Sequence, residues 1–464
     1  MKYILVGAAL VGTSVSAQAA DMAVKAPYLK APVASVYDWS GFYVGVNAGI
    51  GVGRDRTTHN IPGAFNDTFY LQPQGGFGGA QVGYNWQTGS VLGPLVFGVE
   101  ADIQGGDLRD SYPALFGFST NTYSQKIDWF ATARGRIGLA TGPVLSYVTG
   151  GYAYGDVKTT GTETPLGGGA PFGFSTSNGR SGWTYGSGVE AALGGGWTGK
   201  IEYLHLDLGS QSLSIPFGTQ TFNSEIREDI YRVGLNYRIG GASSYVAAAP
   251  ANWAGFYLGG NVGGGRARDR SSITDPVAGG TELFNLAPDG FNGGVHAGYN
   301  WHAANWVFGV EADFQGSAAR DNKTCVVTCL PGTIVAYDAK LPWFGTARGR
   351  LGYSVGPALF YVTGGFAYGA VKNDISISGA PTVTLSAKKA GWTAGAGLET
   401  PFTLLGLFGP NWTSKTEYLY VDLGTVNDTF TSLGVTVLHS TSVKEHIFRT
   451  GLNYHFNSPV VAKY

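Results

Sequence analysis

The sequence predicts an all-β fold in which two eight-stranded antiparallel transmembrane β-barrels follow one another along the chain. Three observations carry this prediction: the chain repeats itself once, its apolar residues alternate with a period of two, and its composition is unusual. Of 464 residues, 74 are glycine, 13% are aromatic and only 13% are charged, about half the charged share of an ordinary soluble domain. This composition suits strands that face lipid on one side and a narrow interior on the other. One barrel of sixteen strands is the alternative that the same alternation allows.

The chain begins with the features of a secretory signal peptide. Lys2 supplies a positive start, residues 3–15 are largely apolar, and Ala17-Gln-Ala fits a small-residue cleavage site. We therefore expect residues 1–19 to be removed, leaving a Pro/Ala-rich periplasmic segment over 20–38. No later apolar run reaches the roughly 18 residues of a membrane helix, so an exported chain this rich in apolar residues points to a β-barrel or to a periplasmic β protein.

A duplication organises the rest of the chain. Trp39-Ser-Gly-Phe-Tyr-Val-Gly returns as Trp253-Ala-Gly-Phe-Tyr-Leu-Gly, an offset of 214 positions. Thr132-Ala-Arg-Gly-Arg returns as Thr346-Ala-Arg-Gly-Arg at the same offset. These and further motifs recur in the same order. They predict a first barrel over 39–240, a linker over 241–252, a second barrel over 253–456 and a C-terminal tail over 457–464.

Within each copy the pattern has the period of two that a half-buried strand requires. Leu95, Phe97 and Val99 fall on one face of a strand, while Glu100 and Asp102 fall on the other. Short turns alternate with long polar connections, as in outer-membrane barrels. In the first copy we predict eight strands, near 41–53, 76–87, 95–106, 124–140, 143–158, 181–193, 197–209 and 227–239.

Both copies place charged residues on the strand face that is turned away from lipid. Positive and negative charges are in near balance there, and buried charges are tolerated only when they are paired. Because an eight-stranded barrel has room only for its own side chains, we interpret these residues as a salt-bridge plug; in a sixteen-stranded barrel they would line a water-filled lumen. The predicted network consists of Glu100, Asp102, Arg134, Arg136, Lys200, Glu202 and Arg232 in the first copy and Glu311, Asp313, Arg348, Arg350, Lys415, Glu417 and Arg449 in the second.

The opposite face of the strands carries aromatic residues. Large rings at the edges of a membrane form interfacial girdles, and we expect lipid contact for these side chains rather than a role in stacking on a ligand. They are Tyr84, Trp86, Trp129 and Tyr203, with Tyr299, Trp301, Trp343 and Tyr418 at the matching positions of the second copy.

Four motifs resemble those of the alphaproteobacterial outer-membrane β-barrel family, the small opacity-like proteins often called outer membrane immunogenic proteins or porin-family proteins. They are Trp-Ser-Gly-Phe-Tyr-Val-Gly at 39–45, Thr-Ala-Arg-Gly-Arg at 132–136, Tyr-Val-Thr-Gly-Gly at 147–151 and Glu-Tyr-Leu-His-Leu-Asp-Leu-Gly at 202–209. The resemblance spans both copies. It implies a surface antigen in the outer membrane of a Gram-negative bacterium. Its partners would be membrane lipid, lipopolysaccharide and the barrel-assembly machinery.

The chain departs from the family pattern in two ways. Family members usually form one barrel, whereas this chain carries two. Their last strand usually ends the chain with an aromatic residue that the assembly machinery reads; here Phe456 ends the last predicted strand and eight residues follow, to Tyr464. Ile239 takes the matching place in the first copy. We therefore expect one assembly signal for the whole chain, at Phe456 or Tyr464.

The sequence offers little for catalysis or for a cofactor. None of the seven histidines lies in a nucleophile motif, and none is matched by histidine in the other copy, so no enzyme, cofactor or metal site is predicted. With 30 basic and 31 acidic residues, the charge gives no case for binding nucleic acid. Binding of haem by loop residues is a weaker hypothesis, because haem iron accepts His or Tyr; the candidates are His59, Tyr70, Tyr123 and His439.

Two cysteines, Cys325 and Cys329, are present. An exported protein meets an oxidising compartment, which favours a disulfide. On a straight strand two residues four positions apart lie too far from each other to bond, so the pair needs a bent loop, and whether it is bonded stays open. For the whole chain we expect a structural or surface-interaction role, with a passive diffusion pore as the alternative.

Overall fold

The computed structural model describes residues 37–456, apart from 63–64, 91–92, 117–118, 166, 216–219, 241–250, 277–279, 325–334, 404–407 and 433. The predicted signal peptide, most of the segment 20–38, most of the linker, the tail and both cysteines therefore lie outside the described residues. Among the residues described, no helix is long and apolar enough to cross a membrane.

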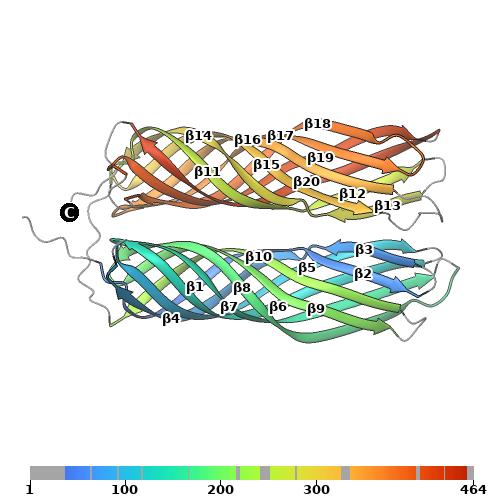
Figure 1. Cartoon of the computed structure of the whole chain (residues 1–464), viewed down its shortest axis with the longest axis horizontal. Helices are drawn as coiled ribbons and strands as arrows, with labels where there is room; N and C mark the ends of the chain where they lie inside the picture. The colour runs from blue at the N-terminus through green and yellow to red at the C-terminus, as the bar shows by residue number, and fades with distance from the viewer. Residues whose placement is uncertain are drawn as a thin grey trace, which may run out of the picture. The chain divides into compact units, whose positions relative to one another are not determined.

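The first copy forms an antiparallel ring whose two end strands pair with each other (Figure 1). The hydrogen-bonded order is β1-β4-β5-β6-β7-β8-β9-β10, and the pairing of β1 with β10 closes the ring. The strands are β1 (Gly41–Gly53), β4 (Gln74–Thr88), β5 (Leu95–Phe116), β6 (Ser119–Thr141), β7 (Val144–Pro165), β8 (Phe172–Gly194), β9 (Trp197–Ile215) and β10 (Gln220–Ile239).

The second copy repeats this plan in the order β11-β14-β15-β16-β17-β18-β19-β20, closed by β11 and β20. Because each ring closes on itself, the prediction of two eight-stranded barrels is confirmed, and a single sixteen-stranded sheet does not form. The strands are β11 (Gly255–Ala267), β14 (Asp289–Ala303), β15 (Trp306–Thr324), β16 (Val335–Val355), β17 (Ala358–Ile377), β18 (Val383–Pro401), β19 (Trp412–Ser432) and β20 (Val435–His455).

Each ring carries one hairpin that the sequence analysis missed. β2 (Asp55–Ile61) and β3 (Phe65–Leu71) pair with each other, and β2 also pairs with β10. β12 (Asp269–Asp275) and β13 (Gly280–Leu286) repeat the arrangement on β20. The prediction of a long polar loop at this place is therefore wrong in both copies.

Several strands also continue beyond their predicted ends. β5 runs to Phe116 instead of ending near 106, and β7 runs to Pro165 instead of ending near 158. The extension of β7 is rich in threonine, and β-branched threonine favours strands. The extension of β5 is not, and carries the charged residues Asp107, Arg109 and Asp110. Beyond the reach of lipid a strand needs no apolar outer face, so a change to polar residues does not mark its end.

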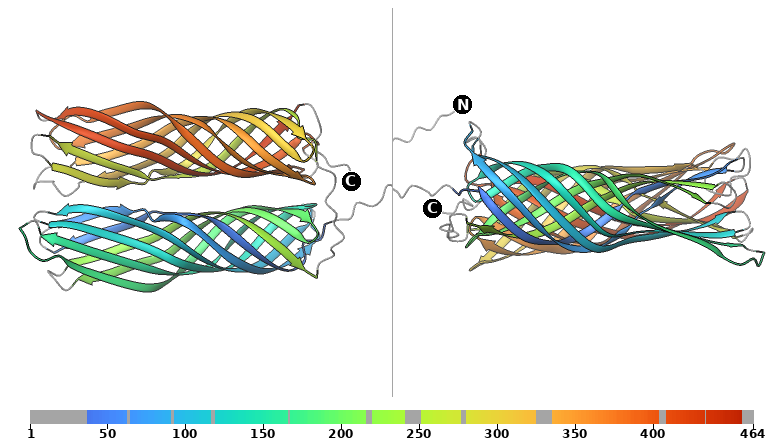
Figure 2. Two further views of the ribbon diagram at one scale, coloured as in Figure 1. Left: turned by 180° about the vertical axis from the view of Figure 1, so that it is seen from behind. Right: turned by 90° about the horizontal axis from the view of Figure 1, so that it is seen from below.

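The short turns gather at one end of each barrel, which we call the short-turn end, and the added hairpins lie at the opposite, far end. Tight turns demand glycine: Gly142, Gly195 and Gly356 have φ values of 61°, 59° and 54°, in the left-handed region that other residues rarely adopt. The strands tilt as they wind around each closed wall, as the views from behind and from below show (Figure 2).

Bulges change which residues face the interior. The register of β5 and β6 shifts between Gly105 and Leu108, and that of β6 and β7 shifts between Ile127 and Trp129. An extra residue in one strand reverses the alternation beyond it. Phe130 and Arg134 therefore face inward below the bulge of β6, and the odd-numbered Ile127 and Tyr123 face inward above it.

The core of each barrel lies inside its wall and is layered along the axis. In the first barrel an aromatic and aliphatic layer at the short-turn end is followed by a layer of charged residues, an aliphatic layer and an aromatic layer at the far end. The first layer contains Tyr37, Trp39, Val96, Ala140, Leu145, Tyr147 and Ala192. The aliphatic layer includes Leu108, Ile127, Val157, Leu204, Leu206 and Ile230, and the far layer includes Phe69, Leu71, Tyr112, Tyr123 and Phe222.

Candidate functional site

The charged layer is built by strand pairing. Glu100 on β5 lies opposite Arg134 on β6, and Glu202 on β9 lies opposite Arg232 on β10. Directly opposed residues of neighbouring strands share one face and stand close enough to interact. The alternation of each strand turns that face inward, so the two pairs converge on the axis of the barrel.

Arg134 is the centre of the first network. Its guanidinium donates to Glu100, to Asp102 Oδ2 at 2.8 Å and to Glu202 Oε1 at 3.2 Å. Glu202 lies on β9, which does not neighbour β6 in the sheet, so this contact crosses the interior. The Arg134 side chain has no exposed area. Three carboxylates therefore take the place of the water that would surround the guanidinium in solution.

Arg232 and Lys200 complete this part of the network. Arg232 Nε donates to Glu202 Oε2 at 2.6 Å, and Arg232 Nη2 donates to Asp102 Oδ2 at 3.0 Å. Lys200 Nζ lies 3.0 Å from both oxygens of Glu100. Three cations thus face three carboxylates, which is the pairing that burial of charge requires.

Arg136 belongs to a second group nearer the short-turn end. It donates to Glu190 Oε2 on β8 at 3.0 Å and lies between two aromatic rings, 4.8 Å from the centroid of Tyr43 and 5.2 Å from that of Tyr147. A guanidinium over an aromatic face gains cation–π attraction that is strongest away from water. Glu190 also accepts a hydrogen bond from Asn236 at 2.9 Å.

Two tyrosines join these groups. The Tyr43 hydroxyl donates to Glu100 Oε2 at 2.8 Å, and the Tyr147 hydroxyl donates to Glu202 Oε1 at 2.8 Å. Room for one ring comes from a glycine, because a Cβ at Gly83 would overlap the Tyr43 hydroxyl. The second barrel keeps this relation between Gly298 and Tyr257.

The second barrel contains the same network with the same roles. Arg348 donates to Glu311, to Asp313 Oδ2 at 3.1 Å and to Glu417 Oε2 at 3.2 Å. Arg350 donates to Glu399 Oε2 at 2.8 Å, as Arg136 does to Glu190. The remaining contacts are Arg449 to Glu417 and Asp313, at 2.7 and 2.8 Å, and Lys415 to Glu311, at 2.8 Å.

The structure therefore brings each predicted set of seven charged residues together in the interior of its own barrel, and every member is buried. Sequence reasoning missed Glu190 and Glu399 and the four tyrosines 43, 147, 257 and 361. The signal was available for the glutamates, since Glu190 has the inward alternation of Thr184 on the same strand. The tyrosines gave no such signal, because tyrosine also occurs on the lipid-facing side, as at Tyr152 and Tyr154.

A tryptophan covers the network on its short-turn side. Trp39 precedes β1, is buried, and donates from its indole to Gly142 O at 3.1 Å in the turn between β6 and β7. Trp253 does the same in the second barrel, donating to Ser354 Oγ at 3.0 Å. In both barrels the chain entering the first strand therefore folds across the mouth of the interior.

The residues proposed for haem binding lie on strands and not on loops, which corrects that expectation. His59 on β2 is buried inside the first barrel, stacked on Phe222 at 4.0 Å and 2.9 Å from Gln220 Oε1. Tyr123 is buried in the same layer, and Tyr70 is on β3. His439 on β20 is buried inside the second barrel at its far end, and this burial lowers the pKa of its imidazole. Within the described ranges no three residues of the metal-binding types gather into a metal site.

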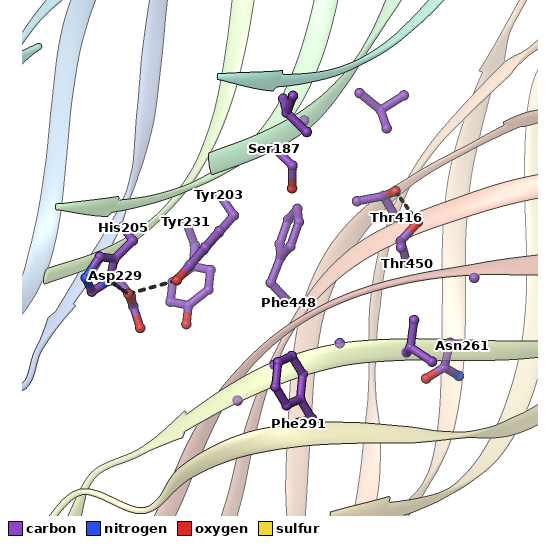
Figure 3. Close-up of a pocket in the computed structure, with 18 of the residues that line it drawn as sticks. Ser187, Tyr203, His205, Asp229, Tyr231, Asn261, Phe291, Thr416, Phe448 and Thr450 are labelled. Carbon is purple, nitrogen blue, oxygen red and sulfur yellow. Dashed lines mark hydrogen bonds and ion pairs between the residues drawn. The ribbon is translucent and has the colours of Figure 1, made fainter. Parts of the chain in front are cut away.

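One polar cluster lies on the outer wall. On β9 and β10 the Tyr203 hydroxyl donates to Asp229 Oδ1 at 2.9 Å, and His205 Nδ1 lies 2.7 Å from the same oxygen (Figure 3). These residues share the outward alternation of the exposed Trp197 and Tyr237. A further hydrogen bond in this view joins Thr416 and Thr450, at 3.1 Å, on the outer face of β19 and β20.

The comparison with known families is unambiguous over the whole described chain. A family model described as an outer membrane protein beta-barrel domain matches residues 7–238 and again residues 239–456. The boundary between the two matches, at 238/239, lies two residues before the linker predicted over 241–252.

Several curated proteins resemble one copy of the repeat. The chain is 35% identical over 253 residues to the 31 kDa outer-membrane immunogenic protein of Brucella melitensis, an alignment that covers 51% of this chain and all of that protein. It is 31% identical over 212 residues to the 22 kDa outer membrane protein of Rhizobium leguminosarum, covering 45% and 82%. It is 30% identical over 237 residues to the 25 kDa outer-membrane immunogenic protein of Brucella abortus, covering 51% and 96%.

Solved structures give weaker matches. Neisserial surface protein A is 15% identical, with a TM-score of 0.23, covering 44% of this chain and 98% of that one. The Pseudomonas putida toluene transporter TodX is 10% identical, with a TM-score of 0.26, covering 90% of each chain.

Proposed function

Since the chain belongs to the outer-membrane β-barrel family and is an outer-membrane protein of Gram-negative bacteria, we propose that it is a non-conducting membrane protein with a structural and surface-interaction role. In this proposal the charged network closes each barrel, catalysis plays no part, and the far ends of the strands meet other molecules outside the cell.

The observation that carries the proposal is the cross-interior contact of Arg134 with Glu202, repeated by Arg348 and Glu417. Each contact joins strands on different sides of a ring whose interior is only wide enough for side chains. Charged groups that line an open lumen would keep water around them. The side chains of Arg134 and Glu202 instead have 0% and 1% of their area exposed.

The layers on either side of the network support a closed barrel as well. A small ion passing along the axis would meet the aliphatic layer of Leu108, Leu204 and Ile230, where no polar group replaces its hydration. It would also meet Trp39 across the short-turn mouth. Closure thus depends on several layers, and loss of one salt bridge would not open a wide pore.

The far end supports the surface-interaction role. Outward-facing charges begin there, with Asp107, Lys126 and Asp128 close above the aromatic Trp129. Beyond this level β5 and β6 continue as a paired wall up to Phe116 and Ser119. We place this wall outside the lipid, where lipopolysaccharide sugars and external macromolecules are its proposed partners.

The proposal is tested by measuring conductance across a planar lipid bilayer containing the full mature chain. Insertion is verified by protease resistance of the barrels and by the heat-dependent shift in electrophoretic mobility typical of folded outer-membrane proteins. We expect no stable conductance steps from inserted protein. Large, stable steps would overturn the proposal, favour the diffusion pore and make the interior charges selectivity residues.

A further inference from the structure

The polar cluster of Tyr203, His205 and Asp229 lies on a wall that should face lipid. Asp229 is ten positions from the short-turn end of β10 at Ile239. At ~3.3 Å per residue and a tilt of about 40°, it stands roughly 25 Å above that end, at the upper edge of the apolar band. On β5 the outward residues over this stretch are Phe97, Val99, Ala101 and Ile103. The wall formed by β9 and β10 therefore differs from that of β5.

The second barrel has a charged residue of the opposite sign at the same depth. Arg266 is eleven positions from the start of β11 at Gly255 and continues the outward alternation of the exposed Phe256, Leu258 and Val262. It lies opposite His446 in register. His446 Nδ1 is 2.7 Å from the Tyr418 hydroxyl on β19, so this wall also carries a polar cluster.

The two copies have diverged in a complementary way at these places. The sequence alignment puts His446 where the first copy has Asp229, and Arg266 where it has Val52. The first barrel thus presents a carboxylate, Asp229, and the second a guanidinium, Arg266. The alternative is that each barrel meets the same barrel of another molecule across a twofold axis. Such an interface repeats the same patch on both sides, so a patch with Asp229 would face a patch with Asp229, and a patch with Arg266 would face a patch with Arg266.

We propose that the two barrels of one chain dock against each other in the membrane, with the outer wall of β9 and β10 facing the outer wall of β20 and β11 and with Asp229 pairing with Arg266. Both barrels have the same orientation, because β10 ends and β11 begins at the short-turn end. The depths of Asp229 and Arg266 therefore agree.

The chain itself favours this partner over a second molecule. Only 240–254 separate β10 from β11, and a connection of this length holds two surfaces at an effective concentration in the millimolar range. A carboxylate and a guanidinium at the edge of the lipid are weakly screened compared with a pair in water, so the complementary charges also fix which walls meet.

Pulsed electron paramagnetic resonance distances test the proposal in the full mature chain. Spin labels are placed at Ser175→Cys on β8 and Ser386→Cys on β18, both exposed, in a background with Cys325→Ser and Cys329→Ser. The protein is reconstituted in vesicles with excess unlabelled chain, so that only distances within a chain are recorded. We expect one narrow distance peak in the parent protein.

Exchanging the charges of Asp229 and Arg266 tests whether the walls that carry them face each other. Asp229→Arg should abolish the narrow peak, and the double variant Asp229→Arg with Arg266→Asp should restore it. Asp156→Arg, an outward charge reversal on β7, is the matched control and should leave the peak unchanged. If Asp229→Arg does not fold, Asp229→Asn and Arg266→Gln take its place, and each should broaden the peak.

Three results would overturn the proposal. A broad distribution in the parent protein would mean that the barrels move independently. A narrow peak that survives every change at Asp229 and Arg266 would mean that other walls meet. A narrow peak from chains labelled at Ser175→Cys alone, without unlabelled protein, would mean that the wall meets a second copy.

Discussion

Arg134 Nη1 and Glu202 Oε1 lie 3.2 Å apart although their strands, β6 and β9, are not neighbours in the sheet. The second barrel holds the equivalent atoms of Arg348 and Glu417 at the same separation, 3.2 Å. Strand pairing alone fixes only neighbouring strands. A contact across the interior ties opposite sides of the wall together, so the network acts on the shape of the barrel as well as on its charge balance.

Replacing Arg134 by methionine should strongly destabilise the first barrel. The change leaves Glu100, Asp102 and Glu202 with too few cations, and breaking a buried pair by removing one partner costs about 3–5 kcal/mol. The loss in the free energy of unfolding is measured by urea-induced unfolding in lipid vesicles. Arg109→Met is the control, because this exposed arginine pairs with the exposed Asp107, at 3.3 Å, and such surface pairs contribute at most ~1 kcal/mol. Equal effects of the two substitutions would show that the network contributes no more than a surface pair.

A glycine substitution tests whether the tyrosines are fixed in place. Gly83→Ala should lower the free energy of unfolding by about 1–3 kcal/mol, the usual cost of overpacking, because the added Cβ would overlap the Tyr43 hydroxyl. Gly135→Ala is a matched control, since its Cβ would meet only Gly150 O, at 4.0 Å. Thermal unfolding of both variants gives the comparison. If the two melt alike, the Tyr43 ring moves freely and does not hold Glu100.

The barrels and their charged interiors could be predicted from the sequence because their signals are local and repeated. Glu100 and Arg134 alternate with apolar residues that must face lipid, so their inward direction follows from a period of two. Because the chain is duplicated, the alternation of each strand can also be checked against the matching strand of the other copy. Which carboxylate each arginine meets could not be predicted, because Arg134 contacts Glu202 only after the ring has closed.

The far end was harder to predict for a physical reason. Outside lipid both faces of a strand tolerate polar residues, so β2 and β3 carry no apolar stripe on the outside. The bulge between Ile127 and Trp129 also reverses the alternation, which turns Tyr123 inward. A strand pattern continued without the bulge would place it outside, and His59 on the missed hairpin could only be taken for a loop residue.

Haem should not bind through the residues that the sequence suggested. His59 is enclosed by Phe222 and Gln220, and His439 is buried within the second barrel. Titration of haem into the purified, folded protein should therefore leave the Soret band of haem unchanged, with unfolded protein as the control for access to the histidines. A Soret shift in the folded protein that disappears in His59→Ala or His439→Ala would contradict this expectation.

Assembly should depend on the end of the second barrel and not on that of the first. Phe456 directly follows β20, donates its backbone N–H to Phe256 O at 3.0 Å and exposes its ring beside Tyr454. Ile239 takes the matching place in the first barrel and is also exposed, but it lacks an aromatic ring.

We propose that the assembly machinery reads one aromatic signal, at Phe456 or Tyr464, because both barrels belong to one chain and need one insertion event. Phe456→Ala or deletion of 457–464 should then lower the amount of folded protein in the outer-membrane fraction, measured by heat-dependent mobility, whereas Ile239→Ala should not. Normal assembly of both the Phe456→Ala variant and the truncated chain would rule out a signal at this end.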